Sequence, residues 1–192
     1  MQTLMHVIAR LYDQVVDCSD NPEGNTERRA WTNLAVESAE LASQIRRTHQ
    51  VVESADSQPY ATARAMFADI ARGHFVVSTA NCVHPLWTPE QNVDFRIVHD
   101  VLGHYDAHLS GRVADFSWEG EVNACAAHET HVFSILARRA ILTECLGQAA
   151  YALTYGHFGT QKVGLLVNRL IDAGLVRAER VHASLYRLTV SS

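Results

Sequence analysis

The stretch from Asn92 to Gln148 constrains the fold of this chain most strongly, because it combines helical packing patterns with a high density of groups that bind metals or move protons. These groups are His99, Asp100, His104, His108, Glu119, Glu121, His128, Glu129, His131 and Glu144. Burying histidines and carboxylates without partners is costly. A fold built from this stretch must therefore pair these side chains with one another or gather them around a cation.

The composition is typical of a soluble globular protein. The 192 residues are 47% hydrophobic, which is enough for a compact core. The net charge of −5 gives no electrostatic reason to expect nucleic acid or an anionic membrane as a partner, since both select for basic surfaces. We expect a cytoplasmic protein, because the chain begins without a signal segment and has no apolar stretch near the roughly 20 residues of a membrane-spanning helix. The residues leave open whether it forms a homo-oligomer.

The cysteines lie far apart and form no C-x-x-C pair, which excludes a zinc ribbon and a thioredoxin-like motif. They are Cys18, Cys82, Cys125 and Cys145. Reduced and mostly buried thiols are expected. Most of the 11 histidines, in contrast, lie between His74 and His131, and this clustering favours a common site.

Apolar residues at helical spacing predict a mostly α fold, a compact helical bundle-like domain with a minor β element. Helices are expected over residues 3–18, 27–53, 61–73, 92–109, 117–138, 140–155 and 161–173, with short strands at 74–79 and near 185–190. We expect residues 1–160 to form the helical metal-binding domain. Residues 161–192 would add a helix and a strand, packed on the same core, and their order also fits a small winged-helix-like element.

The spacing of the first two histidines carries a structural prediction. His99 and His104 are five positions apart, about 140° around an ideal α-helix, so they can bind one ion only if the helix is distorted, as in a π-bulge. Gly103 is a poor helix residue that would permit such a distortion or a close approach of another segment. Asp100, His104 and His108 follow the regular spacing of an undistorted helix.

Two further helices offer polar pairs on one face. Glu121 and His128 share a face of one helix, and Glu144 and Gln148 share a face of the next. A mixed imidazole and carboxylate set suits iron, manganese or zinc, and two histidines with one carboxylate favour iron. Eight other acidic and histidine side chains are expected at the surface or around the site. They are Glu37, Glu40, His74, His84, His108, Glu119, Glu129 and His131.

The segment H-D-V-L-G-H resembles the H-[ED]-x-[LF]-G-H motif of the aromatic amino acid hydroxylases. In that family both histidines bind non-haem iron and a glutamate farther along the chain completes the ligand set. The resemblance implies these roles for His99, His104 and Glu144, which stands in I-L-T-E-C-L-G at a matching separation. It is confined to these motifs, and the hydroxylase catalytic domain is much longer than this chain.

A second resemblance covers about residues 60–166. It is to an uncharacterised domain of phage and other mobile-element proteins, with N-x-x-F-R-x-V-H-D-x-F-G-H, then G-E-x-N-A and a histidine, then T-E-x-x-G-Q and Q-K-x-G-L-L. The matching residues are Asn92, Phe95, Arg96, Val98, His99, Asp100, Gly103, His104, Gly120, Glu121, Asn123, Ala124, His128, Thr143, Glu144, Gly147, Gln148, Gln161, Lys162, Gly164, Leu165 and Leu166. The chain departs from the pattern at Leu102 and Val122. The resemblance implies site residues and no particular reaction.

Together these patterns predict a metal-dependent enzyme, a non-haem iron oxygenase or oxidase acting on a small substrate with dioxygen. Fe(II) is the expected cofactor, with Mn or Zn as alternatives. The expected ligands are His99, His104 and Glu144, with Glu121 and His128 completing the set or holding a second ion. Asp100 would orient a histidine or move protons, and Arg96 and Gln148 would contact substrate.

Two other functions fit the same residues. One is a metal-dependent phosphohydrolase that resembles the HD superfamily, whose signature contains an adjacent His-Asp and often H-D-[IL]-G-H. This chain has one extra residue between Asp100 and Gly103, which moves His104 off the expected face. The other is a binding or assembly module whose ion is structural and coordinatively full.

Overall fold

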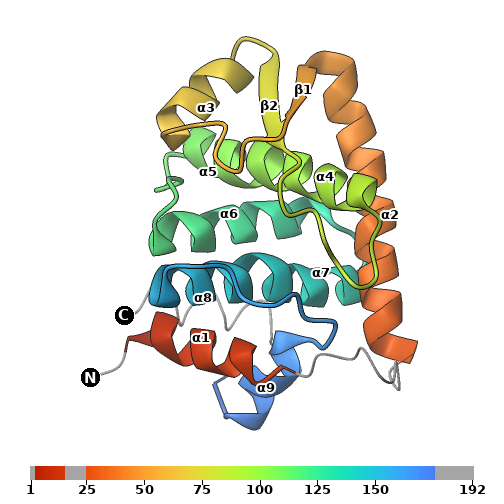
Figure 1. The fold of residues 1–192 in the computed structure, drawn as a ribbon, viewed down its shortest axis with the longest axis vertical. Coiled ribbons are helices and arrows are strands. Elements are labelled where there is room, and N and C mark those ends of the chain that lie inside the picture. The colour runs from red at the N-terminus through yellow and green to blue at the C-terminus, as the bar shows by residue number, and fades with distance from the viewer. Residues whose placement is uncertain (1–2, 16–24, 176–192) are drawn as a thin grey trace.

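One long helix crosses three stacked rows of shorter helices, and a small sheet closes one end (Figure 1). The computed structural model describes residues 3–15 and 25–175. In chain order the elements are α1 (Leu4–Asp13), α2 (Asn25–Thr48), β1 (Gln50–Ser54), α3 (Ala63–Ile70), β2 (His74–Ser78), α4 (Pro89–Val98), η1 (His99–Tyr105), α5 (Asp106–Leu109), α6 (Trp118–His131), α7 (Ile135–Ile141), η2 (Leu142–Gly147), α8 (Gln148–Tyr155) and α9 (Leu166–Asp172). The predicted mostly α fold is confirmed, and no described helix is long and apolar enough to cross a membrane.

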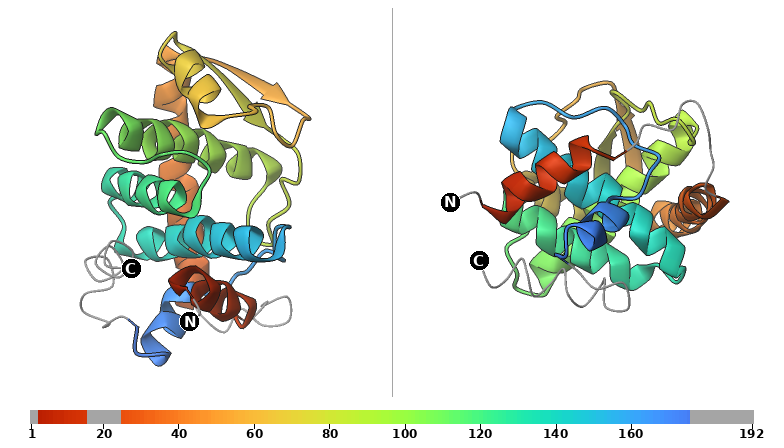
Figure 2. Two further views of the ribbon diagram at one scale, coloured as in Figure 1. Left: turned by 90° about the vertical axis from the view of Figure 1, so that its left-hand side faces the viewer. Right: turned by 90° about the horizontal axis from the view of Figure 1, so that it is seen from below.

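The three rows place the candidate site at the centre of the molecule. The first row is the continuous helix α4–η1–α5, the second is α6, and the third is the continuous helix α7–η2–α8 (Figure 2). Both continuous helices contain a π-helical segment, η1 or η2, in which backbone hydrogen bonds span five residues. The middle row, α6, packs against η1 on one side and η2 on the other. Residues of the two π segments can therefore meet the side chains of α6.

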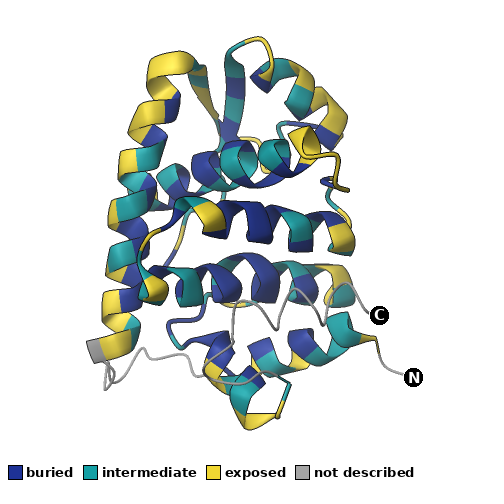
Figure 3. Ribbon diagram, turned by 180° about the vertical axis from the view of Figure 1, so that it is seen from behind, coloured by how far each residue is buried: buried dark blue, intermediate teal, exposed yellow. Residues whose placement is uncertain are grey.

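The long helix and the C-terminal residues enclose the core. α2 packs against α4 and α7, and its outer side is exposed (Figure 3). Trp31 of α2 is fully buried and its indole N–H donates to the carbonyl of Val163, at 2.7 Å. Leu165, Leu166, Val167 and Leu170 contribute their side chains to the same core. The predicted C-terminal strand and Cys18 lie outside the described residues.

The sheet is a parallel pair, β1 and β2, joined by a crossover that contains α3. The predicted strand at 74–79 is confirmed. The prediction that the second helix continues to residue 53 is wrong, because α2 ends at Thr48 and β1 follows it. The β-branched Val51 and Val52 pair with Phe75 and Val76, so partners distant in sequence decide the conformation of this segment.

Other helix boundaries also differ from the prediction. The central helix begins at Pro89, with Thr88 and Gln91 forming a capping box, because proline is compatible with the first helical turn. The predicted helix over 117–138 is two helices, since the chain is not helical between His131 and Ile135. At this break Glu37, expected to face solvent, accepts the backbone N–H of Phe133 at 2.6 Å.

Two more boundaries are corrected by the structure. No break separates residues 138 and 140, because α7, η2 and α8 run on without interruption. The last helix begins at Leu166, five residues after the predicted position 161. Residues 161–165 form neither helix nor strand, and Val163 and Leu165 are buried in the core.

Candidate metal centre

The centre of the site is η1, where the predicted distortion is confirmed. In a π-helix the hydrogen-bonded partner lies five residues away, so side chains at that spacing approach the same face. The rings of His99 and His104 accordingly lie 5.0 Å apart between centroids, almost at right angles. His104 is 2% exposed and His99 is half-buried.

Gly103 allows η1 and α6 to approach closely, as predicted from the presence of a glycine inside this helix. A Cβ atom at residue 103 would lie 2.9 Å from the carbonyl oxygen of Ala124 and 3.2 Å from Nδ1 of His99. Only glycine leaves room for that backbone contact. Since Ala124 is one turn from Glu121 on α6, the approach brings the Glu121 carboxylate to the two histidines.

Glu121 faces both imidazoles through their Nε2 atoms. Its Oε1 lies 3.5 Å from Nε2 of His104, and its Oε2 lies 3.6 Å from Nε2 of His99. Both separations exceed a normal N–H···O hydrogen bond of about 2.7–3.2 Å. Two ligand atoms each about 2.1 Å from one ion, at a tetrahedral angle, would stand about 3.4 Å apart. The spacing of the three side chains thus fits a shared cation better than direct hydrogen bonds.

The opposite ring nitrogens are held by other groups. Nδ1 of His104 donates to the carbonyl of Ala114 at 2.8 Å, so in the neutral imidazole the Nε2 atom carries the lone pair. Nδ1 of His99 pairs with Sγ of Cys145 at 3.3 Å. Partners of this kind fix the ring orientation of metal-binding histidines. Both Nε2 atoms are therefore directed at Glu121.

Without a cation, the electrostatics of the cluster favour an ion pair. Burial disfavours the charged form of His104, but the nearby Glu121 carboxylate outweighs this and raises the pKa of His104. Burial alone would raise the pKa of Glu121, but His104 and His99 together lower it. Glu121 is therefore an anion at neutral pH, as a metal ligand must be.

Asp100 and Arg96 border the cluster without joining it. Burial raises the pKa of Asp100, and the charges of His104 and His99 partly oppose that shift. Asp100 does not belong to a group of metal-binding atoms within 4.8 Å of one another. Arg96, predicted to bind substrate, donates to the carbonyls of Ser78 at 3.1 Å and Ala80 at 2.7 Å. These bonds hold the loop after β2.

Glu144 lies apart from the triad of His99, His104 and Glu121. Its carboxylate accepts a hydrogen bond from Nε2 of Gln161 at 3.3 Å, and it belongs to neither described group of metal-binding atoms. Burial raises the pKa of Glu144 to about 7. Its helical neighbour Gln148 is buried, and neither amide atom has a hydrogen-bond partner.

His128 lies next to His99, with ring centroids 5.7 Å apart. It is fully buried, both ring nitrogens lack a hydrogen-bond partner, and burial lowers its pKa well below the usual value. Nitrogens of His99 and His128 and the Sγ of Cys145 lie within 4.8 Å of one another. The sequence predicted His128 as a ligand but treated Cys145 as an ordinary buried thiol. The position of Cys145 directly after the candidate ligand Glu144 is the one sequence feature that could have indicated that it lies near the site.

The other histidines and acidic groups of the stretch lie away from the triad. His131 contacts Asp106 at 2.8 Å, Glu119 is exposed and Glu129 is buried. His108 stacks on Phe67 with ring centroids 4.5 Å apart. Outside the stretch, His84 is buried between Trp31 and Trp87.

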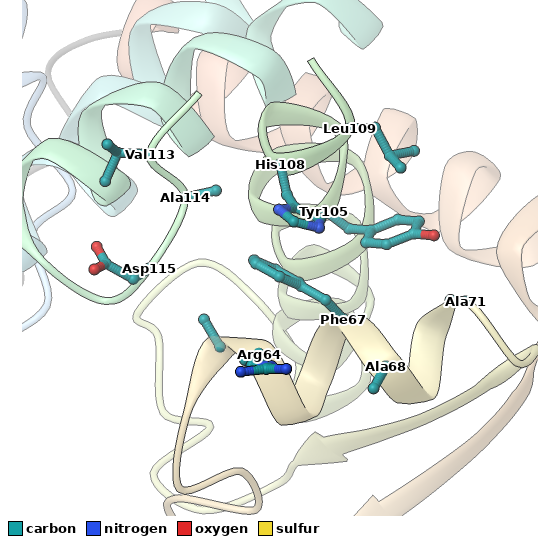
Figure 4. A pocket seen from close by; sticks show the side chains of 11 residues that line it. Arg64, Phe67, Ala68, Ala71, Tyr105, His108, Leu109, Val113, Ala114 and Asp115 are labelled. Atoms are coloured by element: carbon teal, nitrogen blue, oxygen red, sulfur yellow. The ribbon is translucent and has the colours of Figure 1, made fainter. Parts of the chain in front are cut away.

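A surface groove of about 590 Å³ lies beside the Nδ1 side of His104. Its lining includes Phe67, Tyr105, His108 and Ala114, the residue whose carbonyl accepts the His104 hydrogen bond (Figure 4). The Nε2 atom of His104 points to Glu121 instead. The groove therefore adjoins Ala114, whose carbonyl accepts the His104 hydrogen bond, and not the Nε2 atom that faces Glu121.

Comparison with known proteins gives no further assignment. Protein-family models, curated proteins and solved structures contain no match to this chain. The triad of His99, His104 and Glu121 and its surroundings are therefore the basis for inferring a function.

Proposed function

We propose that this chain is a metal-dependent enzyme, a non-haem iron oxygenase or oxidase that acts on a small substrate. His99, His104 and Glu121 would hold the ion. The observation that carries the proposal is the direction of the two rings. Both Nε2 atoms face one carboxylate at 3.5 and 3.6 Å, while both Nδ1 atoms have other partners.

The donor set fits ferrous iron. Two imidazoles and one carboxylate, with open positions opposite them, are the ligands that non-haem Fe(II) oxygenases use. Such an ion supplies one-electron and dioxygen chemistry that side chains alone lack. Manganese or zinc would accept the same ligands. Compared with the predicted set, the geometry supports Glu121 in place of Glu144 as the carboxylate.

Neighbouring residues would orient the ligands and limit access of water. The Ala114 carbonyl and the Cys145 thiol fix the two rings. Phe95 stacks parallel to His99 with centroids 6.1 Å apart, and Phe116 meets His104 edge-on at 5.6 Å. These apolar rings would limit the access of water to the two imidazoles. Asp100, with its pKa raised by burial, would hold or release a proton beside the site.

The phosphohydrolase alternative receives less support from this arrangement. The resemblance to the HD superfamily depends on the adjacent His99 and Asp100, but Asp100 lies outside the group formed by His99, His104 and Glu121. A purely structural ion would leave no open coordination position. It would also make folding depend on the metal.

The test is metal analysis of protein purified without oxygen, with paired variants. Glu121→Gln removes the triad carboxylate, and Glu144→Gln makes the same change at the carboxylate bound by Gln161. We expect about one iron per chain in the parent and in Glu144→Gln, and a loss of at least tenfold in iron affinity in Glu121→Gln. His108→Ala is a control for removing an exposed histidine.

Each outcome bears on a different part of the proposal. Iron retained by Glu121→Gln but lost from Glu144→Gln would contradict the triad and restore the predicted Glu144 ligand. Zinc or manganese in the native protein would instead favour hydrolysis. If the iron protein consumes dioxygen with candidate small substrates, and Glu121→Gln does not while keeping its circular dichroism spectrum, the oxygenase function is supported. A parent protein that unfolds when iron is removed has a structural site.

A further inference from the structure

We propose a second cation site on the other side of the His99 ring, formed by His99, His128 and the thiolate of Cys145. It would bind a zinc-class divalent ion. Ligand atoms of the three side chains lie within 4.8 Å of one another, and they come from three separate elements, η1, α6 and η2. The site is distinct from the triad because it uses Nδ1 of His99 and not Nε2.

The unpartnered state of His128 is the independent observation behind this inference. The side chain is fully buried, and neither Nδ1 nor Nε2 has a hydrogen-bond partner. A neutral imidazole always carries one N–H and one lone pair, so two buried polar atoms remain unsatisfied. Leaving such atoms without partners is unfavourable, and a cation on one of them removes part of that cost.

The distances agree with coordination by nitrogen and sulfur. Sγ of Cys145 lies 3.3 Å from Nδ1 of His99. Ligand bonds of about 2.3 Å to sulfur and 2.1 Å to nitrogen, at a tetrahedral angle, would separate the two atoms by about 3.6 Å. The rings of His99 and His128 lie 5.7 Å apart between centroids. Small side-chain movements would therefore suffice to form the site.

The ligand types determine the class of ion. Thiolate together with imidazole favours zinc and other borderline or soft ions, whereas the carboxylate-containing triad suits harder Fe(II) or Mn(II). The thiol of Cys145 would release its proton to solvent on binding. His99 would bind one ion through each ring nitrogen when both sites are filled, which requires loss of its remaining N–H proton as well. Glu121 and Cys145 supply further negative charge for the two cations.

Cys125 provides a matched control within the same pocket. Its side chain is buried and in hydrogen-bond contact with Cys145, but it does not belong to either group of ligand atoms. Cys125→Ser and Cys145→Ser therefore make the same chemical change at adjacent buried positions. Only the second removes a proposed ligand.

The experiment is titration of the metal-free full chain with Co²⁺, a spectroscopic substitute for Zn²⁺. Coordination by a thiolate gives a sulfur-to-cobalt charge-transfer band in the near ultraviolet, which imidazole and carboxylate ligands do not give. We expect two equivalents of Co²⁺ and this band in the parent and in Cys125→Ser. Cys145→Ser should lose the band and one equivalent. His128→Phe, which fills the ring volume without a ligand, should do the same.

The experiment separates this site from the triad. Glu121→Gln should lose one equivalent and keep the charge-transfer band, because it changes only the triad. Absence of the band in the parent, or its persistence in Cys145→Ser that is folded by circular dichroism, overturns the second site. The triad is judged separately, by whether the equivalent of Co²⁺ that gives no such band disappears in Glu121→Gln.

Discussion

Gly103→Ala tests the close approach of η1 and α6 on which the triad depends. The added Cβ would lie 2.9 Å from the Ala124 carbonyl oxygen, whereas ordinary contacts begin near 3.4 Å. The two backbones must therefore separate by about 0.5 Å (3.4 − 2.9). A side-chain rotation cannot relieve this contact, because the Cβ atom is bonded directly to the backbone of η1 and the carbonyl oxygen belongs to the backbone of α6.

Two opposing effects set the expected loss of stability. Alanine gains about 0.5–1 kcal/mol over glycine in a helix, since it loses less conformational entropy on folding. Overpacking of a close contact costs about 1–3 kcal/mol. We therefore expect a net decrease of up to about 2.5 kcal/mol (3 − 0.5) in the free energy of unfolding of the metal-free protein. A shift of 0.5 Å also exceeds the roughly 0.2 Å tolerance of metal–ligand distances. Metal affinity should fall about 10- to 100-fold.

The assays are urea denaturation of the metal-free protein and metal titration of the folded protein. Gly111→Ala is the control: Gly111 has a φ of +73° and nothing within 4 Å of an added Cβ, so alanine there is strained without touching the site. It should cost about 1–2 kcal/mol and leave metal affinity unchanged. If Gly103→Ala is as stable as the parent and binds metal equally well, the triad does not depend on the close approach of η1 and α6 at Gly103.

Three further predictions concern groups outside the triad. Burial lowers the pKa of His84 from 6.5 to about 4. As the pH falls from 6.5 to 4, His84 is therefore protonated in the unfolded chain but not in the folded one, and the free energy of unfolding decreases by up to about 3 kcal/mol. His84→Phe should reduce this loss of stability, as measured by urea denaturation across those pH values. Because the pKa of Glu144 is raised from 4.5 to about 7, the folded state keeps its proton and stability falls as pH rises between these values, by up to about 3 kcal/mol. Glu144→Gln should be stabilised relative to the parent at pH 8 and not at pH 4, and an equal difference at both values would contradict the raised pKa. Glu37→Ala removes the acceptor for two backbone N–H groups at the start of α7 and should cost about 1–2 kcal/mol by thermal or urea unfolding, whereas Glu40→Ala on the exposed side of α2 should change stability little.

Local sequence rules predicted the helices and the distortion of η1. Apolar spacing determines which side of a helix is buried, and the five-residue interval between His99 and His104 required a π segment if both rings were to face one point. The same rules failed for β1. Its residues Val51 and Val52 extend the helical pattern of α2, and only pairing with β2 makes the extended conformation favourable.

The sequence alone could not predict which of the candidate carboxylates lies beside the two histidines. Glu121, Glu144 and His128 were all candidates by residue type, and motif similarity favoured Glu144 as the carboxylate. The structure brings Glu121 to the histidines and gives Glu144 a hydrogen bond from Gln161 instead. Spacing along one helix cannot predict this outcome, because it depends on how closely two helices pack.

The sequence by itself determined the helical class of this protein, the buried polar stretch and the histidines that define its centre, since each follows from residue type and short-range periodicity. The tertiary structure decided which carboxylate meets those histidines and that Cys145 lies beside His99 and His128. The physical reason is the close packing of α6 between η1 and η2, made possible at Gly103 by the absence of a side chain. Contacts of that kind join residues distant in sequence, and no local pattern encodes them.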